Sequence, residues 1–208
     1  MKPTARAITA AAAAAVTIGL LMPGAAASPA AAGARAWHGP PDDTIAATIP
    51  VPGGEPAQVA VNSYTNTVYV TSGATSGVLV ISGKTNKIVK TVSLGSGASG
   101  GDQKGVAVNA QTNRIYVALG TQVKVLSGRT NKVVATITGK GLYAQLLAVN
   151  PVTNTVYATN NLGAAFDAVS VINGSTNKVV ATVPEPLLPE GIAVNPRTNR
   201  IYVTCGSK

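Results

Sequence analysis

One short motif occurs four times along the chain, and this repetition constrains the fold more than any other feature of its 208 residues. Each copy holds an Ala-Val-Asn triplet followed by a Thr-Asn pair, and the asparagine of the triplet recurs at spacings of 47, 41 and 45 residues. The copies align without gaps and read VAVNSYTNTVYV from Val59, VAVNAQTNRIYV from Val106, LAVNPVTNTVYA from Leu147 and IAVNPRTNRIYV from Ile192.

A period in the forties is shared by four-stranded propeller blades and two-helix solenoid repeats, and the local pattern favours strands. Each repeat contains four short runs rich in Val, Ile, Thr and Tyr, separated by Gly, Asn, Ser or Pro. In the second repeat we expect strands at Gly105–Asn109, Arg114–Ala118, Val123–Ser127 and Lys132–Thr138. Four antiparallel strands per repeat predict an all-β chain, a β-propeller with about three and a half blades present.

The asparagines of the Thr-Asn pairs are expected in tight hairpin turns. Such a turn needs a residue at positive φ, which Asn tolerates better than most non-glycine residues. A ladder of asparagines that binds a ligand is the alternative, but turns alone account for the repetition. The turns between first and second strands hold Asn66, Asn113, Asn154 and Asn199, and those between third and fourth strands hold Asn86, Asn131 and Asn177, each three residues after a glycine.

A tyrosine recurs at one phase of the second strand in every repeat, at Tyr69, Tyr116, Tyr157 and Tyr202. We expect these rings to pack between neighbouring blades, where their large buried area stabilises the fold. A row of rings that stacks on sugars is the alternative. The lysine after each second Thr-Asn pair opens the outermost strand, where charge deters pairing with other chains.

At these residues the chain resembles the YVTN-repeat β-propeller family. The four-letter motif is matched with one change each at Tyr69–Ser72, Tyr157–Asn160 and Tyr202–Cys205, and only in its first two letters at Tyr116–Leu119. Val169 to Pro196 resembles the rest of the family pattern, with Asn173 in place of its Asp. The resemblance covers residues 44 to 208 and implies a secreted or surface-attached bacterial or archaeal propeller with a binding role.

Residues 1–27 have the outline of a secretory signal peptide. Lys2 and Arg6 precede a mostly apolar run of 16 residues, and Ala25 to Ala27 offers small residues for cleavage, with a second possible site before Trp37. A membrane span needs about 20 predominantly apolar residues, so we expect no transmembrane segment after cleavage. The predicted organisation is a signal at 1–27, a flexible Pro, Ala and Gly-rich linker at 28–43 and repeats at 44–208, in a secreted or cell-surface protein.

Residues that carry chemistry are scarce in this chain. One cysteine, Cys205, and one histidine, His38 in the linker, exclude an internal disulfide framework, a cysteine or histidine metal cluster and a Ser-His-Asp set. Gly95, Gly97 and Gly100 spell G-x-G-x-x-G, but a strand follows where a dinucleotide site needs a helix. We therefore predict no catalytic, metal or cofactor-binding residue and no cofactor.

The chain is basic. Without Lys2 and Arg6, the mature chain has 14 Lys and Arg against seven acids, a formal charge of about +7. No run of consecutive basic residues concentrates this charge, so we interpret it as a dispersed, solubilising charge and do not expect a nucleic-acid partner. The seven acids lie outside the repeated motifs, where nothing in the sequence pairs them.

The strands do not add up to whole blades. Thr44 to Val51 resembles the last strand of a blade, three complete repeats follow, and Ile192 to Cys205 supplies two more strands. Three alternatives remain open: a four-bladed ring closed within one chain, a homodimer that completes a ring of seven or eight blades, and a fragment.

The sequence as a whole predicts an exported, non-enzymatic propeller scaffold that binds a protein, a cell-envelope polymer or a small ligand. The alternative is an enzyme of the lactonase-like or dehydrogenase-like propeller class, which two converging carboxylates in a pocket would favour. Nonspecific nucleic-acid binding through the basic surface is a further alternative, and it predicts an affinity that falls steeply with salt.

Overall fold

The computed structural model describes residues 8–9, 47–73, 75, 77–95, 105–161, 167–185 and 188–206. The chain divides into two compact units, one of Met1–Ala11 with Ile49–Lys208 and one of Ala12–Thr48. All sheets belong to the first unit. The predicted signal peptide and linker fall outside the described residues except for Ile8 and Thr9, so they stay predictions.

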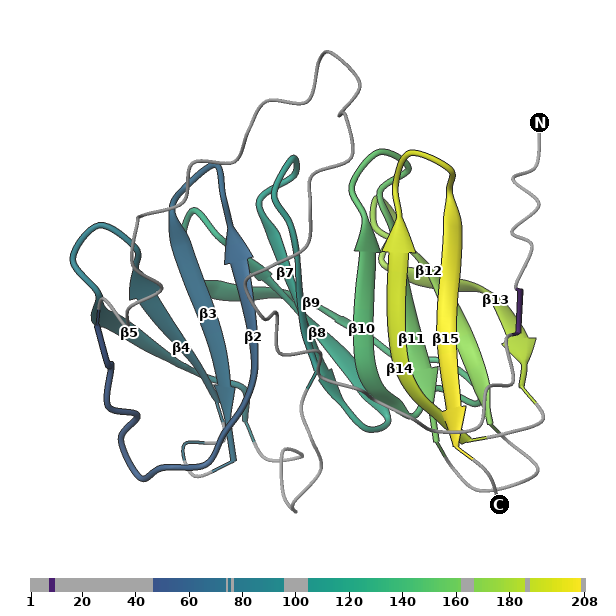
Figure 1. Cartoon of the computed structure of the whole chain (residues 1–208), viewed down its shortest axis with the longest axis horizontal. Helices are drawn as coiled ribbons and strands as arrows, with labels where there is room; N and C mark the ends of the chain where they lie inside the picture. Colours follow the sequence, from purple (N-terminus) through teal and green to yellow (C-terminus); the bar gives the residue numbers. More distant parts are fainter. Residues whose placement is uncertain are drawn as a thin grey trace, which may run out of the picture. The chain divides into compact units, whose positions relative to one another are not determined.

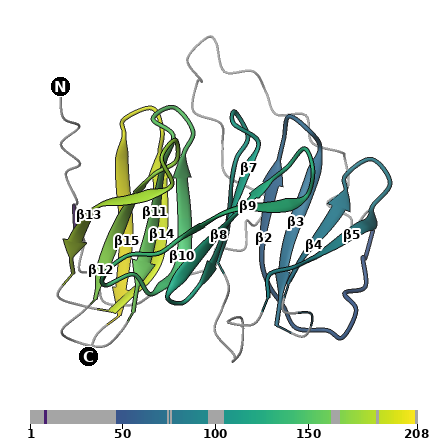
Figure 2. The same cartoon turned by 180° about the vertical axis from the view of Figure 1, so that it is seen from behind.

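Three four-stranded antiparallel sheets follow one another along the chain (Figure 1), with strands in simple sequence order. The fourth strand of each lies at the edge of its sheet, as the view from behind shows (Figure 2). The first sheet contains β2 (Pro56–Asn62), β3 (Thr67–Ser72), β4 (Gly77–Ser82) and β5 (Lys87–Ser93), the second β6 (Val106–Asn109), β7 (Arg114–Leu119), β8 (Gln122–Ser127) and β9 (Lys132–Ile137), and the third β10 (Ala144–Asn150), β11 (Thr155–Asn160), β12 (Ala168–Asn173) and β13 (Lys178–Pro184).

The last sheet is shorter. It pairs β14 (Leu188–Asn195) with β15 (Arg200–Gly206) in antiparallel fashion, and the two-residue β1 (Ile8–Thr9) lies parallel along the other side of β15. The fourth strand expected at Thr44 to Val51 is wrong over the residues that the structure describes, because 47–51 are not in a strand. A fourth strand needs a third strand as partner, and the last sheet offers only β1 in that place.

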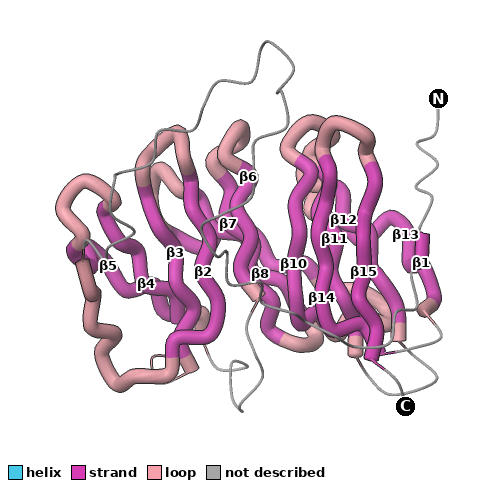
Figure 3. The backbone as a smooth tube through the Cα atoms, viewed as in Figure 1, coloured by secondary structure: helices cyan, strands magenta, loops and turns pink. Residues whose placement is uncertain are grey.

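The predicted fold class is confirmed. The described residues form strands, turns and loops (Figure 3), and no helix among them is long and apolar enough to span a membrane. The four strands expected in the second repeat are β6 to β9, each within one residue of its expected bounds. The chain thus carries three whole β-propeller blades and part of a fourth.

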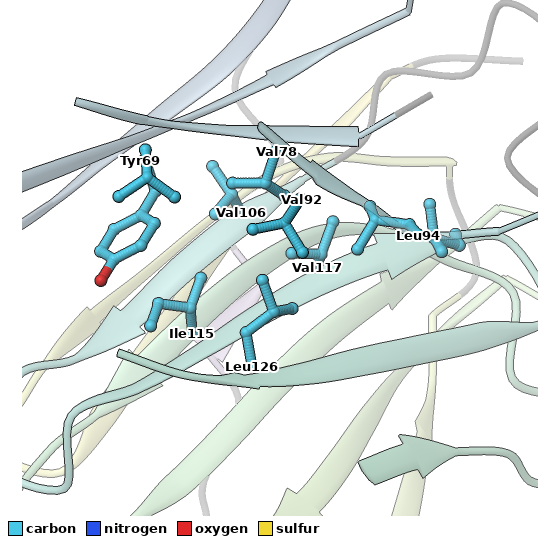
Figure 4. Close-up of a cluster of buried hydrophobic side chains, with 10 residues drawn as sticks. Tyr69, Val78, Val92, Leu94, Val106, Ile115, Val117 and Leu126 are labelled. Carbon is cyan, nitrogen blue, oxygen red and sulfur yellow. The ribbon is translucent and has the colours of Figure 1, made fainter. Parts of the chain in front are cut away.

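The core lies between consecutive sheets. Figure 4 shows the first cluster, in which Tyr69 and Val78 of the first sheet meet Ile115 and Val117 of the second. A second cluster joins the second and third sheets, and a third joins the third and last sheets. No buried cluster within the described ranges joins the last sheet to the first. Each blade is therefore held by its neighbours in sequence.

Candidate functional site

The seven hairpin asparagines adopt the left-handed conformation that tight turns require, with φ between 48° and 53°. The turn between third and fourth strands packs directly on the turn between first and second strands. In the second sheet the Gly128 amide donates to the Asn113 carbonyl at 2.9 Å, and a Cβ on Gly128 would overlap the Asn113 side-chain oxygen. Gly83 and Gly174 lie in the same way over Asn66 and Asn154. Only glycine therefore fits three residues before Asn86, Asn131 and Asn177, because a Cβ there would overlap the asparagine of the neighbouring turn.

The asparagine of each of the first three Ala-Val-Asn triplets closes its own turn and also reaches the next sheet. In the second sheet, Asn109 Oδ1 accepts the amides of Gln111 and Thr112, at 3.1 and 3.2 Å, and its Nδ2 donates to Asn154 Oδ1 at 2.8 Å. The same contact recurs at each junction, and we call this series the asparagine ladder. It joins Asn62 to Asn113 at 2.9 Å, Asn109 to Asn154, and Asn150 to Asn199 at 2.7 Å.

The ladder is structural, since its donors are fully buried and their amides point into neighbouring turns. The repeated motif identifies these asparagines but does not by itself predict hydrogen bonds between sheets. The signal was present, because each triplet asparagine stands four residues before a hairpin asparagine. What the sequence lacks is the offset that places one sheet's triplet against the next sheet's turn.

The tyrosines of the second strands divide into two groups. Tyr69, Tyr116 and Tyr157 are buried between consecutive sheets, where burial raises the pKa of each phenol above its ordinary value. Tyr202 on the last sheet is exposed. The three buried rings belong to the core, so they are not available for stacking on a ligand.

Basic residues gather at one edge of the sheets. Turns between first and second strands and between third and fourth strands lie at the same end of an antiparallel sheet, and the asparagine ladder brings these ends together in consecutive sheets. We call this end the turn edge. Eight of the eleven described basic residues lie in these turns or immediately after them, namely Lys84, Lys87, Arg114, Arg129, Lys132, Lys178, Arg197 and Arg200.

The charge on the turn edge is uncompensated within the described part of the chain. Seven of its eight basic residues are exposed, and Arg114 is half-buried. The four described acids, Glu55, Asp167, Glu185 and Glu190, lie at the other ends of the strands, beside the irregular connections. The interpretation of the charge as dispersed is therefore corrected for these residues. The hairpin topology places basic residues at one end of the sheets and acidic residues at the other, although no two basic residues are adjacent in sequence.

The opposite end, which we call the loop edge, holds a small group of buried acids. Asp167 and Glu185 are buried, and the Glu185 amide donates to the Asp167 carbonyl at 2.9 Å. Burial raises the pKa of the Glu185 carboxyl. Burial, together with the negative charges of Glu185, Glu190 and Asp167, raises the pKa of the Cys205 thiol, which disfavours a reactive thiolate. Over the described ranges, no three His, Cys, Asp or Glu side chains are arranged to hold a metal ion.

An open groove lies between the outer strands of the second and third sheets. It has a volume of about 620 Å³, and its lining includes Thr136, Lys140, Lys178, Val180 and Thr182 from β9, β13 and the connection after β9. Lys178 also belongs to the turn edge, so the groove opens onto the basic surface. The exposed lysines and threonines suit a polar, negatively charged occupant.

These features define a protein of propeller-type blades with a basic turn edge. Among solved structures, the chain is similar to Kuenenia stuttgartiensis hydrazine synthase, with a TM-score of 0.56 and 17% sequence identity over 66% of this chain. The chain spans 39% of the length of that protein. No family model and no curated protein matches the chain. At this identity the similarity shows the propeller-like fold alone.

Proposed function

We propose that this chain is an exported, non-enzymatic scaffold of the YVTN-repeat type, which binds an anionic polymer of the cell envelope through its turn edge. The observation that carries the proposal is the gathering of eight basic residues at the turn edge, with every described acid at the opposite end. The outline of a signal peptide at residues 1–27 supports export, and the repeated Tyr-Val-Thr and Thr-Asn motifs support the family.

A linear polyanion fits the turn edge better than a compact ligand does. The basic side chains are spread over four consecutive sheets, with Lys87, Lys132 and Lys178 at equivalent positions in three of them. Each exposed contact is weak, but several cations that neutralise successive phosphates release counterions together and sum to a useful affinity. The groove at Lys178 extends this surface between two sheets.

The experiment is a binding titration with a glycerol-phosphate polymer across a range of salt concentrations. The protein is purified after export, and its N-terminus is determined by mass spectrometry, so that an uncleaved Met1 would refute the signal peptide separately. One variant replaces Lys87, Lys132 and Lys178 with Gln. The matched control replaces Ala57, Ser93 and Thr121 with Glu, which lowers the net charge by the same three units at exposed positions away from the turn edge and the groove.

The turn-edge variant should bind more weakly, and its plot of log affinity against log salt should be flatter by about 0.7 for each lost phosphate contact. The control should retain most of the affinity. If both variants weaken binding equally, net charge rather than the turn edge is responsible and the proposal is wrong. Equal affinity for heparin would reduce the binding to nonspecific attraction, and tighter binding to single-stranded DNA would favour a nucleic-acid partner.

The enzymatic alternative rests on one observation, the two buried carboxyl groups of Asp167 and Glu185 at the loop edge. A raised pKa at Glu185 is a property of general acids. Hydrolysis of a simple lactone by the unmodified chain, abolished in Glu185→Gln and retained in Glu190→Gln, would establish this alternative. If the unmodified chain shows no turnover and Glu185→Gln still binds the polymer, the enzymatic alternative is wrong and the scaffold proposal stands.

A further inference from the structure

Neighbouring sheets in this chain are joined by two different faces. The preceding sheet contributes the face that carries the tyrosine of its second strand. In the first sheet this face includes Ala60, Tyr69 and Val80. The following sheet presents its opposite face, as Val106 and Val117 do in the second sheet. We call these the tyrosine face and the valine face. Within the chain, a tyrosine face packs on the next valine face at three successive junctions.

The tyrosine face of the last sheet has no sheet packed on it within the described part of the chain. Tyr202 is 48% exposed, whereas Tyr69, Tyr116 and Tyr157 are at most 3% exposed. Thr204, in the next position of the same face, is also exposed, although its counterparts in the other three sheets are buried. The short β1 pairs with the edge of β15 rather than with this face.

The valine face of the first sheet is open along its first strand. Val59 and Val61 on β2 are 61% and 57% exposed, whereas Val106, the counterpart of Val59 in the second sheet, is 7% exposed. Leu79 and Ile81 lie farther across the same face and are buried, so the open part is the β2 side. This side is where a preceding sheet would place its first and second strands, as β2 and β3 lie against β6 in the next sheet.

The asparagine ladder ends at the same two faces with opposite hydrogen-bonding character. Asn195 closes its own turn through Oδ1, with the amides of Arg197 and Thr198 at 3.0 and 3.3 Å, but its Nδ2 has no partner among the described residues. Asn66 Oδ1 is the first acceptor position of the ladder, and it receives no bond from another described side chain. The last sheet thus offers a donor, and the first sheet an acceptor.

We propose that the tyrosine face of the last sheet binds the valine face of the first sheet in a second copy of this chain. Tyr202 would pack against Val68 of the second copy, as Tyr69 packs against Ile115 within the chain (Figure 4). Asn195 Nδ2 would donate a hydrogen bond to Asn66 Oδ1 of that copy. A second copy is the fitting occupant because the chain itself carries both halves of an interface that it already forms three times. Such a head-to-tail contact either closes into a ring or continues as a chain of copies.

The experiment measures the mass of the purified chain in solution over a range of concentrations by light scattering and sedimentation velocity, with Cys205 reduced. One variant, Tyr202→Lys, places a charge in the tyrosine face, and a second, Val61→Lys, places one in the valine face. The matched control is Val180→Lys, because Val180 is 60% exposed but lies on the outer strand β13, away from both faces. Circular dichroism and urea unfolding verify that all three fold.

The unmodified chain and the Val180→Lys control should associate, and each face variant alone should be monomeric at the same concentrations. An equimolar mixture of the two face variants should form a heterodimer and nothing larger, because one intact tyrosine face then meets one intact valine face. A monomeric unmodified chain overturns the proposal. So does a face variant that still associates alone, which would mean that like faces pair, or a control that dissociates equally.

Discussion

The asparagine ladder predicts that Asn109→Ala destabilises the fold more than the same change at Asn195. Asn109 makes three hydrogen bonds, two to amides of its own turn and one to Asn154 in the next sheet. Asn195 makes the same two turn bonds but has no described partner for its Nδ2. The difference between the two substitutions therefore measures the bond between sheets together with the deeper burial of the Asn109 side chain.

The magnitude follows from the net value of a protein hydrogen bond, about 0.5 to 1.5 kcal/mol. The two turn bonds of Asn195 should be worth about 1 to 2 kcal/mol, because the amides that they leave behind are exposed and can bind water. Asn109→Ala should cost about 2 to 4 kcal/mol, since the inter-sheet bond and the buried volume of a fully buried side chain are lost as well. The expected difference is about 1 to 2 kcal/mol.

The assay is equilibrium urea unfolding of both variants with Cys205 reduced, with the midpoints compared at a common slope. Asn109→Asp is a useful third variant, because it keeps the acceptors of the turn bonds but replaces the amide donor to Asn154 with a buried carboxylate oxygen, so it should cost at least as much as Asn109→Ala at neutral pH. Equal losses of stability in Asn109→Ala and Asn195→Ala would show that the ladder adds nothing beyond the turns, and would refute the reasoning.

Two further predictions concern space and charge. Gly141→Ala should cost ~1 to 2 kcal/mol of stability, because Gly141 has a positive φ of 75° but open space around it. Gly128→Ala should cost well over that amount, because the added Cβ would overlap the side chain of Asn113. Thermal unfolding of both variants measures the difference, and equal losses of stability would contradict the prediction. Burial raises the pKa of Glu185 in the folded state, so its charged form destabilises the fold above that pKa. Glu185→Gln should therefore raise Tm near pH 7, and the gain should vanish below about pH 4, the unfolded pKa. Thermal unfolding of both proteins across this pH range measures the effect, and a gain that persists at about pH 3 would contradict it.

Local features of this chain were predictable from its sequence. The strands of the second repeat follow from β-branched runs between turn residues, and the positions of the turns follow from the Thr-Asn pairs. Thr44 to Val51 shows the limit of this reasoning. Its composition resembles that of the β13 region, but a strand exists only where a partner strand pairs with it, and partners are set by the tertiary structure.

The turn edge and the asparagine ladder needed the sheets as well as the strands. Arg114 and Lys132 are 18 positions apart in sequence and lie at the same end of the second sheet only because alternate hairpins of an antiparallel sheet point the same way. The bond from Asn62 to Asn113 spans 51 residues and depends on the offset between two sheets. Counting basic residues turn by turn, rather than looking for consecutive runs, would have found the first feature but not the second.

The ladder also bears on how such a chain can grow. Each of the first three triplet asparagines bonds within its own turn and to the turn of the following sheet, and each core cluster spans two consecutive sheets. A gene duplication that inserts one whole repeat therefore brings its own donor and acceptor, and recreates every junction that it interrupts. An insertion of half a repeat leaves a donor facing no acceptor. Selection on this architecture should therefore favour length changes in whole units of about 45 residues, with stability added one junction at a time.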